Sequence, residues 1–392
     1  MGRNRVSLEI CEACAEAVKL ADVDVIAAYP ITPQTHIVET LSAMVADGIL
    51  DAEYINVESE HSAMSCCIGS SAAGARSFTA TAAQGLALMS EMLFIASGLR
   101  LPIVMALVTR TLSAPLSIWG DHSDVMSVRD CGWITVFAEN GQEVFDFTLQ
   151  GFRIAEDERV LFPFMVCLDG FHLSHVIEPV ELISEEEARD FLPIYRPRYR
   201  LHPNEPISMG CFAMPEYFME IKKRQDEELK ASYDVIIEVW EEWEKRFGRS
   251  YAPLVTYQTE DAEAIILIAG SYAGTARLAV DDMRKKGLKV GLASLKLWRP
   301  FPLRDIREIL GRTEVVVVVD RALSVGGAGG PMACEVRSAF HGESPSPKVV
   351  SFVAGLSGRD ILRSDFEEMV QRALSHAEKG ELPYYEMFGV RE

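Results

Sequence analysis

Short apolar runs alternate with segments of helical periodicity along the first half of the chain. Apolar runs of about four to eight residues bounded by small or polar residues predict buried parallel strands, and three- to four-residue spacing predicts helices that cover them. Strands are predicted at residues 23–29, 54–57, 77–83, 103–109, 134–138 and 164–169. Helices are predicted at residues 34–47, 60–74, 85–99 and 142–158. This alternation is typical of a doubly wound α/β domain.

A second alternation of the same kind follows in the last third of the chain. Strands are predicted at residues 264–269, 289–295, 315–320 and 348–353. Helices are predicted at residues 273–286, 303–311, 329–340 and 359–375. The pattern therefore predicts two doubly wound α/β domains, residues 1–249 and 250–392, joined near residues 249–262.

Two further segments differ in composition from these alternating regions. Residues 184–214 are rich in Pro and basic residues and predict irregular structure. Residues 215–248 predict a long charged helix with an apolar stripe that includes Trp240 and Trp243. We expect the stripe to pack on the body of the protein, with a partner-binding helix as the alternative. Residues 1–20 contain three glutamates and predict an amphipathic helix, not a signal peptide.

Composition and charge exclude several classes of protein. The 392 residues are 48% hydrophobic and 24% charged, which excludes a disordered chain, a collagen-like repeat and a small disulfide scaffold. The net charge of −20 without any Lys/Arg block argues against a nucleic-acid partner or an anionic membrane surface. No apolar stretch approaches the ~20 residues that cross a bilayer. The eight scattered cysteines suit reduced, buried thiols, so a cytoplasmic protein is expected.

The sharpest local signal is the strand-to-helix junction AYPITPQT at residues 28–35. Thr32 is placed to cap the helix and Pro33 to occupy its first position. Open α/β sheets bind ligands at the carboxyl ends of their strands, and a helix N-terminus there favours an anion such as a carboxylate. A well-capped helix without a ligand is the alternative.

Charged residues follow two other predicted strands. Arg110 comes directly after the strand at 103–109, where its guanidinium can pair with a carboxylate. A surface ion pair is the alternative. Glu60 lies in the first turn of the helix predicted at 60–74, where stabilisation by the helix dipole is the alternative to a catalytic role. Glu58 is only two residues away, and spacing alone does not choose between the two.

Several weaker patterns do not predict a metal site. Asp121, His122 and Asp124 fall within four residues and suit an active-site or interface loop better than a metal centre. His172 and His175 lack an evident third ligand, and the C-x-x-C pair at residues 11–14 lacks a second pair at ferredoxin spacing. The glycine-rich run 326–330 predicts a tight turn, with contact to a phosphate or coenzyme A as the alternative.

Taken together, seven motifs resemble one known family. They are YPITPQT (29–35), NVESEHSA (56–63), FTATAAQGL (78–86), RTLSAP (110–115), IWGDHSD (118–124), GSYAGT (270–275) and DRALS (320–324). The chain resembles the α subunits of the multi-subunit pyruvate:ferredoxin oxidoreductases, within the 2-oxoacid:ferredoxin oxidoreductase family. The resemblance covers nearly the whole chain, and the combination of motifs is specific although each motif alone is not.

This resemblance implies a function and a set of partners. Members are thiamine diphosphate enzymes of anaerobic metabolism that decarboxylate a 2-oxoacid, pass electrons to ferredoxin and transfer the acyl group to coenzyme A. The implied fold is a thiamine pyrimidine-binding-type domain followed by a transketolase C-terminal-like domain. Partner subunits of the β, γ and δ types would hold magnesium, the diphosphate and the [4Fe-4S] clusters. The absence of a Gly-Asp-Gly segment with a downstream Asn agrees with such a shared site.

The resemblance also assigns roles to residues. Glu60 matches the glutamic acid that hydrogen-bonds N1′ of the aminopyrimidine and thereby promotes removal of the thiazolium C2 proton. Thr32 and Arg110 match the residues that bind the 2-oxoacid carboxylate, and Pro30, Ile31 and Gln84 match cofactor contacts. Pyruvate is the expected substrate, and no metal is expected in this chain. The alternatives are a branched-chain 2-oxoacid, 2-oxoglutarate, or a non-catalytic nucleotide-binding subunit.

Overall fold

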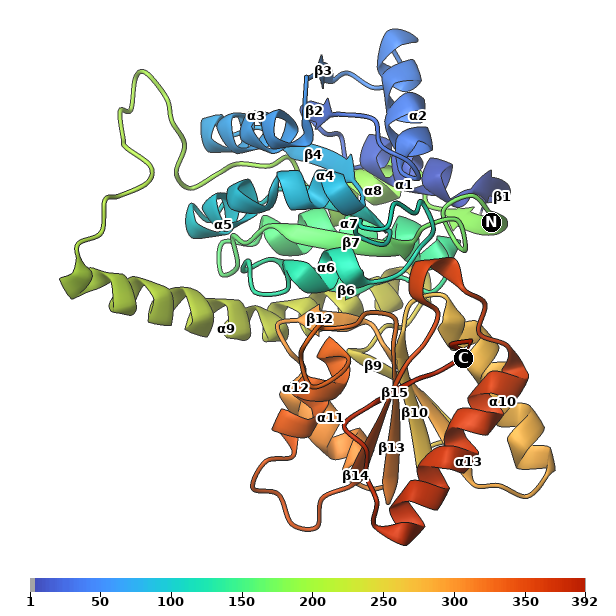
Figure 1. The fold of residues 1–392 in the computed structure, drawn as a ribbon. Coiled ribbons are helices and arrows are strands. Elements are labelled where there is room, and N and C mark those ends of the chain that lie inside the picture. The colour runs from blue at the N-terminus through green and yellow to red at the C-terminus, as the bar shows by residue number, and fades with distance from the viewer. Residues whose placement is uncertain (1–3, 392) are drawn as a thin grey trace.

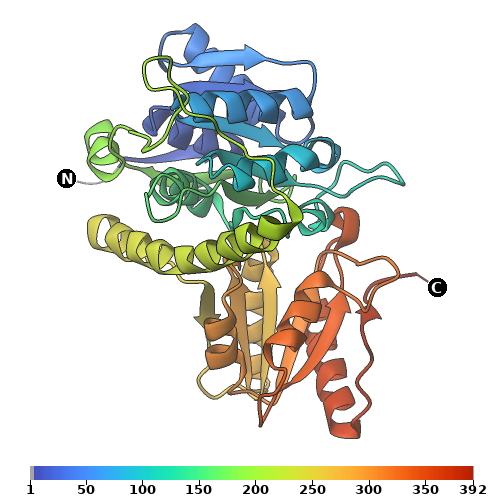
Figure 2. The same ribbon diagram turned by 90° about the vertical axis from the view of Figure 1, so that its left-hand side faces the viewer.

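The computed structural model describes residues 4–391 and consists of two stacked α/β units, with one long helix running between them (Figure 1). The first unit forms the upper half of the view and the second unit the lower half. A quarter turn shows the long helix lying across the front of the junction (Figure 2). The predicted fold class, two doubly wound α/β units, is confirmed.

A seven-stranded sheet forms the centre of the first unit. Its elements are β1 (Asn4–Glu9), α1 (Ile10–Leu20), β2 (Val25–Ala28), α2 (Thr35–Ala46), β3 (Glu53–Asn56), α3 (Glu60–Ala73), β4 (Ser77–Thr81), α4 (Ala83–Leu88), α5 (Ser90–Gly98), β5 (Val104–Thr109), α6 (Ser123–Ser127), β6 (Ile134–Phe137), α7 (Gly141–Ala155), β7 (Phe164–Asp169), β8 (Ile177–Leu182), α8 (Glu185–Phe191) and α9 (Pro215–Phe247). The strand order is β12-β6-β7-β5-β4-β2-β3, in which β12 (Leu297–Arg299) comes from the last third of the chain, and the pairs from β6 to β3 are parallel. These strands are buried and continuously apolar, which is why the apolar runs in the sequence were enough to locate them.

The second unit has a six-stranded sheet in the order β15-β14-β13-β10-β11-β9. Its elements are β9 (Leu254–Tyr257), β10 (Ala264–Ala269), α10 (Tyr272–Lys285), β11 (Val290–Leu295), β12 (Leu297–Arg299), α11 (Leu303–Leu310), β13 (Val315–Asp320), α12 (Pro331–Ala339), β14 (Lys348–Val353), the short 3₁₀ helix η1 (Leu356–Gly358), α13 (Arg363–Lys379) and β15 (Glu386–Met387). All pairs are parallel except β9 with β11.

One apolar core is common to both units. Buried side chains of the α3–α6 face, such as Met64 and Trp133, belong to the same packed cluster as Trp298 and Leu310 of the second unit. In addition, β12 leaves the second unit to pair antiparallel with β6, with Leu297 opposite Val136. The opposite faces of the sheets have separate cores, which involve α1, α2, α7 and α9 in the first unit and α10 and α13 in the second. The two sheets are therefore joined by packed side chains and backbone pairing.

Three local predictions were wrong. The first helix begins at Ile10, because residues 4–9 instead form β1, whose antiparallel pairing with β8 is a long-range contact. The irregular segment 184–214 begins with α8, which has a capping box of Ser184 and Glu187. The helix expected at 85–99 is divided into α4 and α5 at Met89.

The helix α9 is buried along its second half and largely exposed along its first half. The buried residues are Ser232, Val235, Ile236, Val239, Trp240, Trp243 and Phe247. Thus the apolar stripe packs on the body of the protein, as expected. Within residues 4–391, no helix has the length and apolar character needed to cross a membrane.

Trp243 and Phe218 provide a test of this packing on a single helix. Trp243 is fully buried, donates a hydrogen bond from Nε1 to Asp146 Oδ2 (3.0 Å) and contacts the ring of Phe191. We expect Trp243→Ala to lower the free energy of unfolding by about 3–5 kcal/mol, because it leaves a cavity in the core and removes one hydrogen bond to Asp146. Phe218 is exposed, so Phe218→Ala should change it by no more than about 0.5 kcal/mol. Urea unfolding of the chain measures both, and equal losses would contradict the packing.

Candidate active site

The YPITPQT segment forms a turn between β2 and α2 rather than a capped helix start. α2 begins at Thr35 with Gln34 as its N-cap residue, so the prediction that Thr32 caps the helix was wrong. The Gln34 backbone N–H donates to Ile31 O (2.9 Å), and its side-chain Nε2 donates to Tyr29 O (2.8 Å). These bonds hold Thr32 at the outside of the turn, where its side chain is exposed.

Arg110 is fixed by two hydrogen bonds and keeps one nitrogen free. The residue follows β5 and is 5% exposed. Nη1 donates to Thr32 O (2.7 Å) and Nε donates to Ser117 O (2.9 Å). Nη2 has no hydrogen-bond partner among the described residues. The long-range bond to Thr32 thus brings the two predicted carboxylate-binding residues together.

A buried carboxylate, Asp124, connects Arg110 to the start of α4. Asp124 is fully buried, and its Oδ2 accepts from the backbone N–H of Arg110 (2.9 Å) and of Ala83 (3.0 Å). Burial raises the pKa of Asp124 to about 8. Ala83 has a φ of +42°, an unfavourable backbone conformation for alanine that the bond to Asp124 helps to hold. Asp124 therefore sets where α4 lies relative to Arg110.

Glu60 lies at the first position of α3 and faces α4. It follows the N-cap residue Ser59, which accepts from Ser62 N (3.2 Å), and it is 6% exposed. A Cβ on Gly85 would lie 2.6 Å from Glu60 Oε1 and closer still to Thr81 Oγ1. Glycine at position 85 is thus required for the close approach of α4 to this carboxyl group.

The structure separates Glu60 from Glu58. Glu58 is exposed and accepts a hydrogen bond from the Ser62 hydroxyl, which lowers the pKa of Glu58. Glu60 makes no hydrogen bond or ion pair with any residue that the structure describes. Thr81 Oγ1 and Gln84 Oε1 are likewise buried without a partner. Because buried polar atoms are normally paired, this group of unpaired atoms fits a polar ring bound between α3 and α4.

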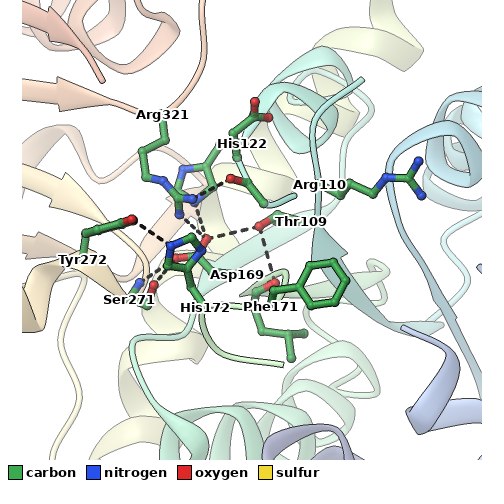
Figure 3. A network of polar contacts seen from close by, with 12 residues as sticks. Thr109, Arg110, His122, Asp169, Phe171, His172, Ser271, Tyr272 and Arg321 are labelled. Atoms are coloured by element: carbon green, nitrogen blue, oxygen red, sulfur yellow. Dashed lines mark hydrogen bonds and ion pairs between the residues drawn. The ribbon is translucent and has the colours of Figure 1, made fainter. Parts of the chain in front are cut away.

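A second buried carboxylate, Asp169, joins the two units (Figure 3). It ends β7 and pairs with His122 Nε2 (2.8 Å) of the first unit and Arg321 Nη1 (2.7 Å) of the second. Ser271 donates to it from its backbone N–H (2.8 Å) and hydroxyl (2.5 Å), and Thr109 donates from its hydroxyl (3.2 Å). The carboxyl ends of β5 and β7 therefore face those of β10 and β13 across one anion.

The surroundings of Asp169 keep it ionised. Burial by itself would raise the pKa of Asp169, but the positive charge of Arg321 and the interactions with His122 and Ser271 outweigh it and hold the pKa well below its usual range. Arg321 also donates from Nη2 to Gly120 O (2.8 Å) and stacks 4.8 Å from the ring centroid of Tyr272. Ser271 is the N-cap residue of α10, so the carboxylate also occupies the positive end of that helix.

The loop after Arg110 serves as an interface loop, as expected. Ser357 of the second unit donates its backbone N–H to Asp121 Oδ2 (3.0 Å), and His122 N donates to Arg321 O (2.8 Å). With Asp124 bound to backbone amides, each member of the Asp-His-x-Asp group already has protein partners. The interpretation of these residues as a metal centre gains no support.

The helix N-terminus that follows the glycine-rich run 326–330 is already occupied. Asp320 accepts from the backbone N–H groups of Met332 (2.9 Å) and Ala333 (3.0 Å) at the N-terminus of α12. A Cβ on Gly330 would collide with that same carboxyl group. An anion bound at this end of α12 would therefore have to displace Asp320.

Sequence reasoning proposed Thr32, Arg110, Glu60 and Gln84 as site residues, and it missed the role of Asp169. Pro30 and Ile31 lie on the same turn as Thr32, on its exposed and half-buried positions. The available signal for Asp169 was a single charged residue at the end of the apolar run 164–169. Its partners are far away in sequence, so spacing could not show them.

The Asp169 network can be tested by unfolding. Removing one member of a buried ion pair leaves an uncompensated charge, so Asp169→Ala should lower the free energy of unfolding by about 3–5 kcal/mol. Asp360→Ala is the control, because Asp360 is exposed and pairs with His172 at the surface, at 3.7 Å. This variant should change the free energy of unfolding by no more than about 0.5 kcal/mol. Equal effects of the two variants would contradict this role.

The stability difference between the wild type and Asp169→Ala should depend on pH. The pKa of Asp169 in the folded chain lies below the ordinary value of about 3.9. Its stabilising contribution is therefore complete above about pH 4 and is lost as the pH falls further, towards the folded-state pKa. The difference in unfolding free energy between the wild type and Asp169→Ala should shrink in that range, as measured by urea titrations at several pH values.

Comparisons with known proteins agree along the whole chain. A family model described as the thiamine diphosphate-binding domain of pyruvate flavodoxin/ferredoxin oxidoreductase matches residues 16–241, and one described as pyruvate:ferredoxin oxidoreductase core domain II matches residues 262–366. The chain is 47% identical over 372 residues to pyruvate synthase subunit PorA of Methanocaldococcus jannaschii, covering 94% of each chain. It is 42% identical over 372 residues to ketoisovalerate oxidoreductase subunit VorA of Pyrococcus abyssi, covering 94% of this chain and 93% of that one.

Two solved structures share the fold. A 2-oxoglutarate:ferredoxin oxidoreductase from Magnetococcus marinus has a TM-score of 0.70 at 21% identity, with 96% of this chain and 66% of that chain covered. A split-gene transketolase has a TM-score of 0.55 at 12% identity, with 95% of this chain and 99% of that chain covered. The resemblance drawn from the motifs is confirmed. The chain belongs to the pyruvate flavodoxin/ferredoxin oxidoreductase family, as a PorA-type subunit of a multi-subunit enzyme.

Proposed function

We propose that this chain is the α subunit of a pyruvate:ferredoxin oxidoreductase. The complex would convert pyruvate and coenzyme A to acetyl-CoA and CO₂ and pass two electrons, one at a time, to ferredoxin. The observation that supports this most is the buried, unpartnered carboxyl group of Glu60, packed against the glycine turn of α4.

Glu60 is the catalytic residue of the proposal. Bound thiamine diphosphate supplies the nucleophilic carbon and the electron sink for decarboxylation. Glu60 would hold a proton between its carboxyl group and N1′ of the aminopyrimidine, at the place where Gly85 and Thr81 pack closely against it. Gln84 Oε1, an unpaired buried acceptor, suits the exocyclic amino group of that ring. Pro30 and Ile31 would border the site from the turn after β2.

Arg110 and Thr32 would bind the carboxylate of the substrate. Two nitrogens of Arg110 are used to fix the guanidinium, and Nη2 remains to donate to the substrate. A charge-assisted hydrogen bond of this kind contributes about 1.5–3 kcal/mol. Arg110 donates a hydrogen bond to the Thr32 carbonyl, so the two residues lie next to each other. The exposed Thr32 hydroxyl would be a second donor to the substrate carboxylate.

Pyruvate is favoured over the other 2-oxoacids. Six PorA relatives are 46–47% identical to this chain and a seventh is 40% identical, whereas the VorA relative is 42% identical. A branched-chain 2-oxoacid is the second candidate, since the carboxylate-binding residues do not touch the tail that distinguishes the two acids. Initial rates of ferredoxin reduction across a panel of 2-oxoacids decide between them.

Partner subunits complete the proposed site. Across residues 4–391, the single group of three or more possible metal ligands is Glu9, Cys11 and His175, so no cysteine set suited to an iron–sulfur cluster gathers there. We therefore assign the [4Fe-4S] clusters, magnesium and the diphosphate to β-, γ- and δ-type subunits. Coenzyme A is the co-substrate and ferredoxin the electron acceptor in this proposal.

Replacement of Glu60 tests the catalytic role. We expect Glu60→Gln to lower kcat for pyruvate-dependent ferredoxin reduction by roughly 100- to 10 000-fold, because the amide cannot exchange the proton. Glu58→Gln is the matched control two residues away, and its activity should equal that of the wild type. Assays use the reconstituted complex, and a fully active Glu60→Gln complex would refute the assignment.

Replacement of Arg110 tests substrate binding. Lysine keeps the charge but loses the planar fork, so Arg110→Lys should raise KM for pyruvate roughly 10- to 100-fold, with a smaller effect on kcat. Arg159→Lys changes an exposed arginine and should leave KM unchanged. An unchanged KM in Arg110→Lys would contradict the proposed contact.

A further inference from the structure

Four side chains with metal-binding donor atoms meet outside the active site. Glu9 ends β1, Cys11 lies in the first turn of α1, His36 lies in the first turn of α2, and His175 follows β7. The chain brings His36 and His175 from distant positions to the neighbouring pair Glu9 and Cys11, whereas His172 lies elsewhere, with Tyr272.

The donor atoms are close together. One ligand atom each from Glu9, Cys11 and His175 lies within 4.8 Å of the other two. Glu9 Oε1 is 2.6 Å from His36 Nδ1, and the ring centroids of His36 and His175 are 4.6 Å apart. Donor atoms around a tetrahedral Zn²⁺ are about 3.5 Å apart, so an ion requires these side chains to draw in by about 1 Å.

Backbone and side-chain contacts hold the donors in place. Cys11 N donates to Ser174 O (3.3 Å) and Ile10 N donates to Val176 O (3.1 Å), which fixes α1 on the segment that carries His175. His175 Nδ1 is 2.7 Å from Ser174 Oγ. With the proton on Nδ1, Nε2 has the free lone pair that a metal binds, and the Ser174 hydroxyl orients the ring.

The chemistry of the donors selects the class of ion. A thiolate and an imidazole favour Zn²⁺ and its first-row neighbours, whereas Mg²⁺ and Ca²⁺ prefer oxygen ligands alone. We propose that Glu9, Cys11 and His175 bind one divalent transition-metal ion, of which Zn²⁺ is the best match, with water in the fourth position. His36 donates to Glu9 and positions that carboxylate, so it is a positioning residue.

Charge is balanced in this site. The Glu9 carboxylate and the Cys11 thiolate together neutralise the ion, and His175 is neutral. Burial and the neighbouring His36 lower the pKa of His175, which favours the neutral ring. Burial raises the pKa of Cys11 well above its usual value, so binding displaces one proton, from the Cys11 thiol, to solvent.

The ion would tie three segments together beside the active site. The first turn of α2, which contains His36, directly follows the turn that presents Thr32. A row of aromatic rings continues from His175 to Phe171 (4.8 Å) and from Phe171 to Trp119 (4.7 Å) in the interface loop. The proposed ion therefore braces the outer side of the substrate-binding turn without touching the substrate.

Cobalt substitution tests the site directly. The full-length untagged chain is dialysed against a chelator and then titrated with Co²⁺, and Zn²⁺ content is measured separately by elemental analysis. We expect one equivalent of bound metal, a cobalt–thiolate charge-transfer band in the near ultraviolet, and a melting temperature raised by Zn²⁺. Cys11→Ser should remove the band and the thermal shift. Cys211→Ser, at an exposed thiol, should retain both.

Further variants keep the test decisive. His175→Gln changes a different segment and should abolish stoichiometric binding even if Cys11→Ser does not fold, which circular dichroism reports. His36→Gln should weaken Co²⁺ affinity roughly 10- to 100-fold, as expected for a group that orients a ligand. Absence of stoichiometric metal in the wild type, or an unchanged band in folded Cys11→Ser, would overturn the proposal. These readouts do not depend on the proposed enzymatic function.

Discussion

The Asp169 carboxylate determines how the two sheets meet. A single buried charge in a protein interior costs several kcal/mol unless it is paired and hydrogen-bonded. Asp169 obtains its partners from both units, since His122 belongs to the first and Arg321 and Ser271 belong to the second. Neither unit alone satisfies it, and for that reason the carboxyl ends of the parallel strands, where side chains gather, are forced to face each other.

The active-site residues depend on this arrangement indirectly. The loop that leads from Arg110 to Asp124 is held from one side by Arg321 through Gly120 O, and from the other by the two amides that Asp124 binds. Arg110 and Glu60 make no contact with each other in this chain of bonds. The buried acceptor Asp124 sets the position of Arg110 relative to α4, against which Glu60 packs. The groups proposed to bind ligands therefore remain free of protein partners.

The sequence predicted what short-range patterns can determine. Continuous apolar runs located the buried strands, and the motif resemblance chose Glu60 over Glu58, a choice that spacing left open and that burial supports. Long-range contacts account for the errors. The capping rule failed at Thr32. The turn that contains Thr32 is closed by Gln34, and the Thr32 carbonyl accepts a hydrogen bond from Arg110. The helical pattern failed at residues 4–9 because β8 pairs with them.

Stability and chemistry are divided between two kinds of carboxylate in this chain. Asp169, Asp320 and Asp124 each accept hydrogen bonds from donors of the chain and thereby hold elements together. Glu60 lies against α4 without a donor from any described residue, near the buried and unpartnered Thr81 Oγ1 and Gln84 Oε1. These unpaired groups suit a polar ligand that supplies the missing partners. The helix N-termini of α10 and α12 already hold carboxyl groups, which agrees with the proposal that a partner subunit binds the anionic end of such a ligand.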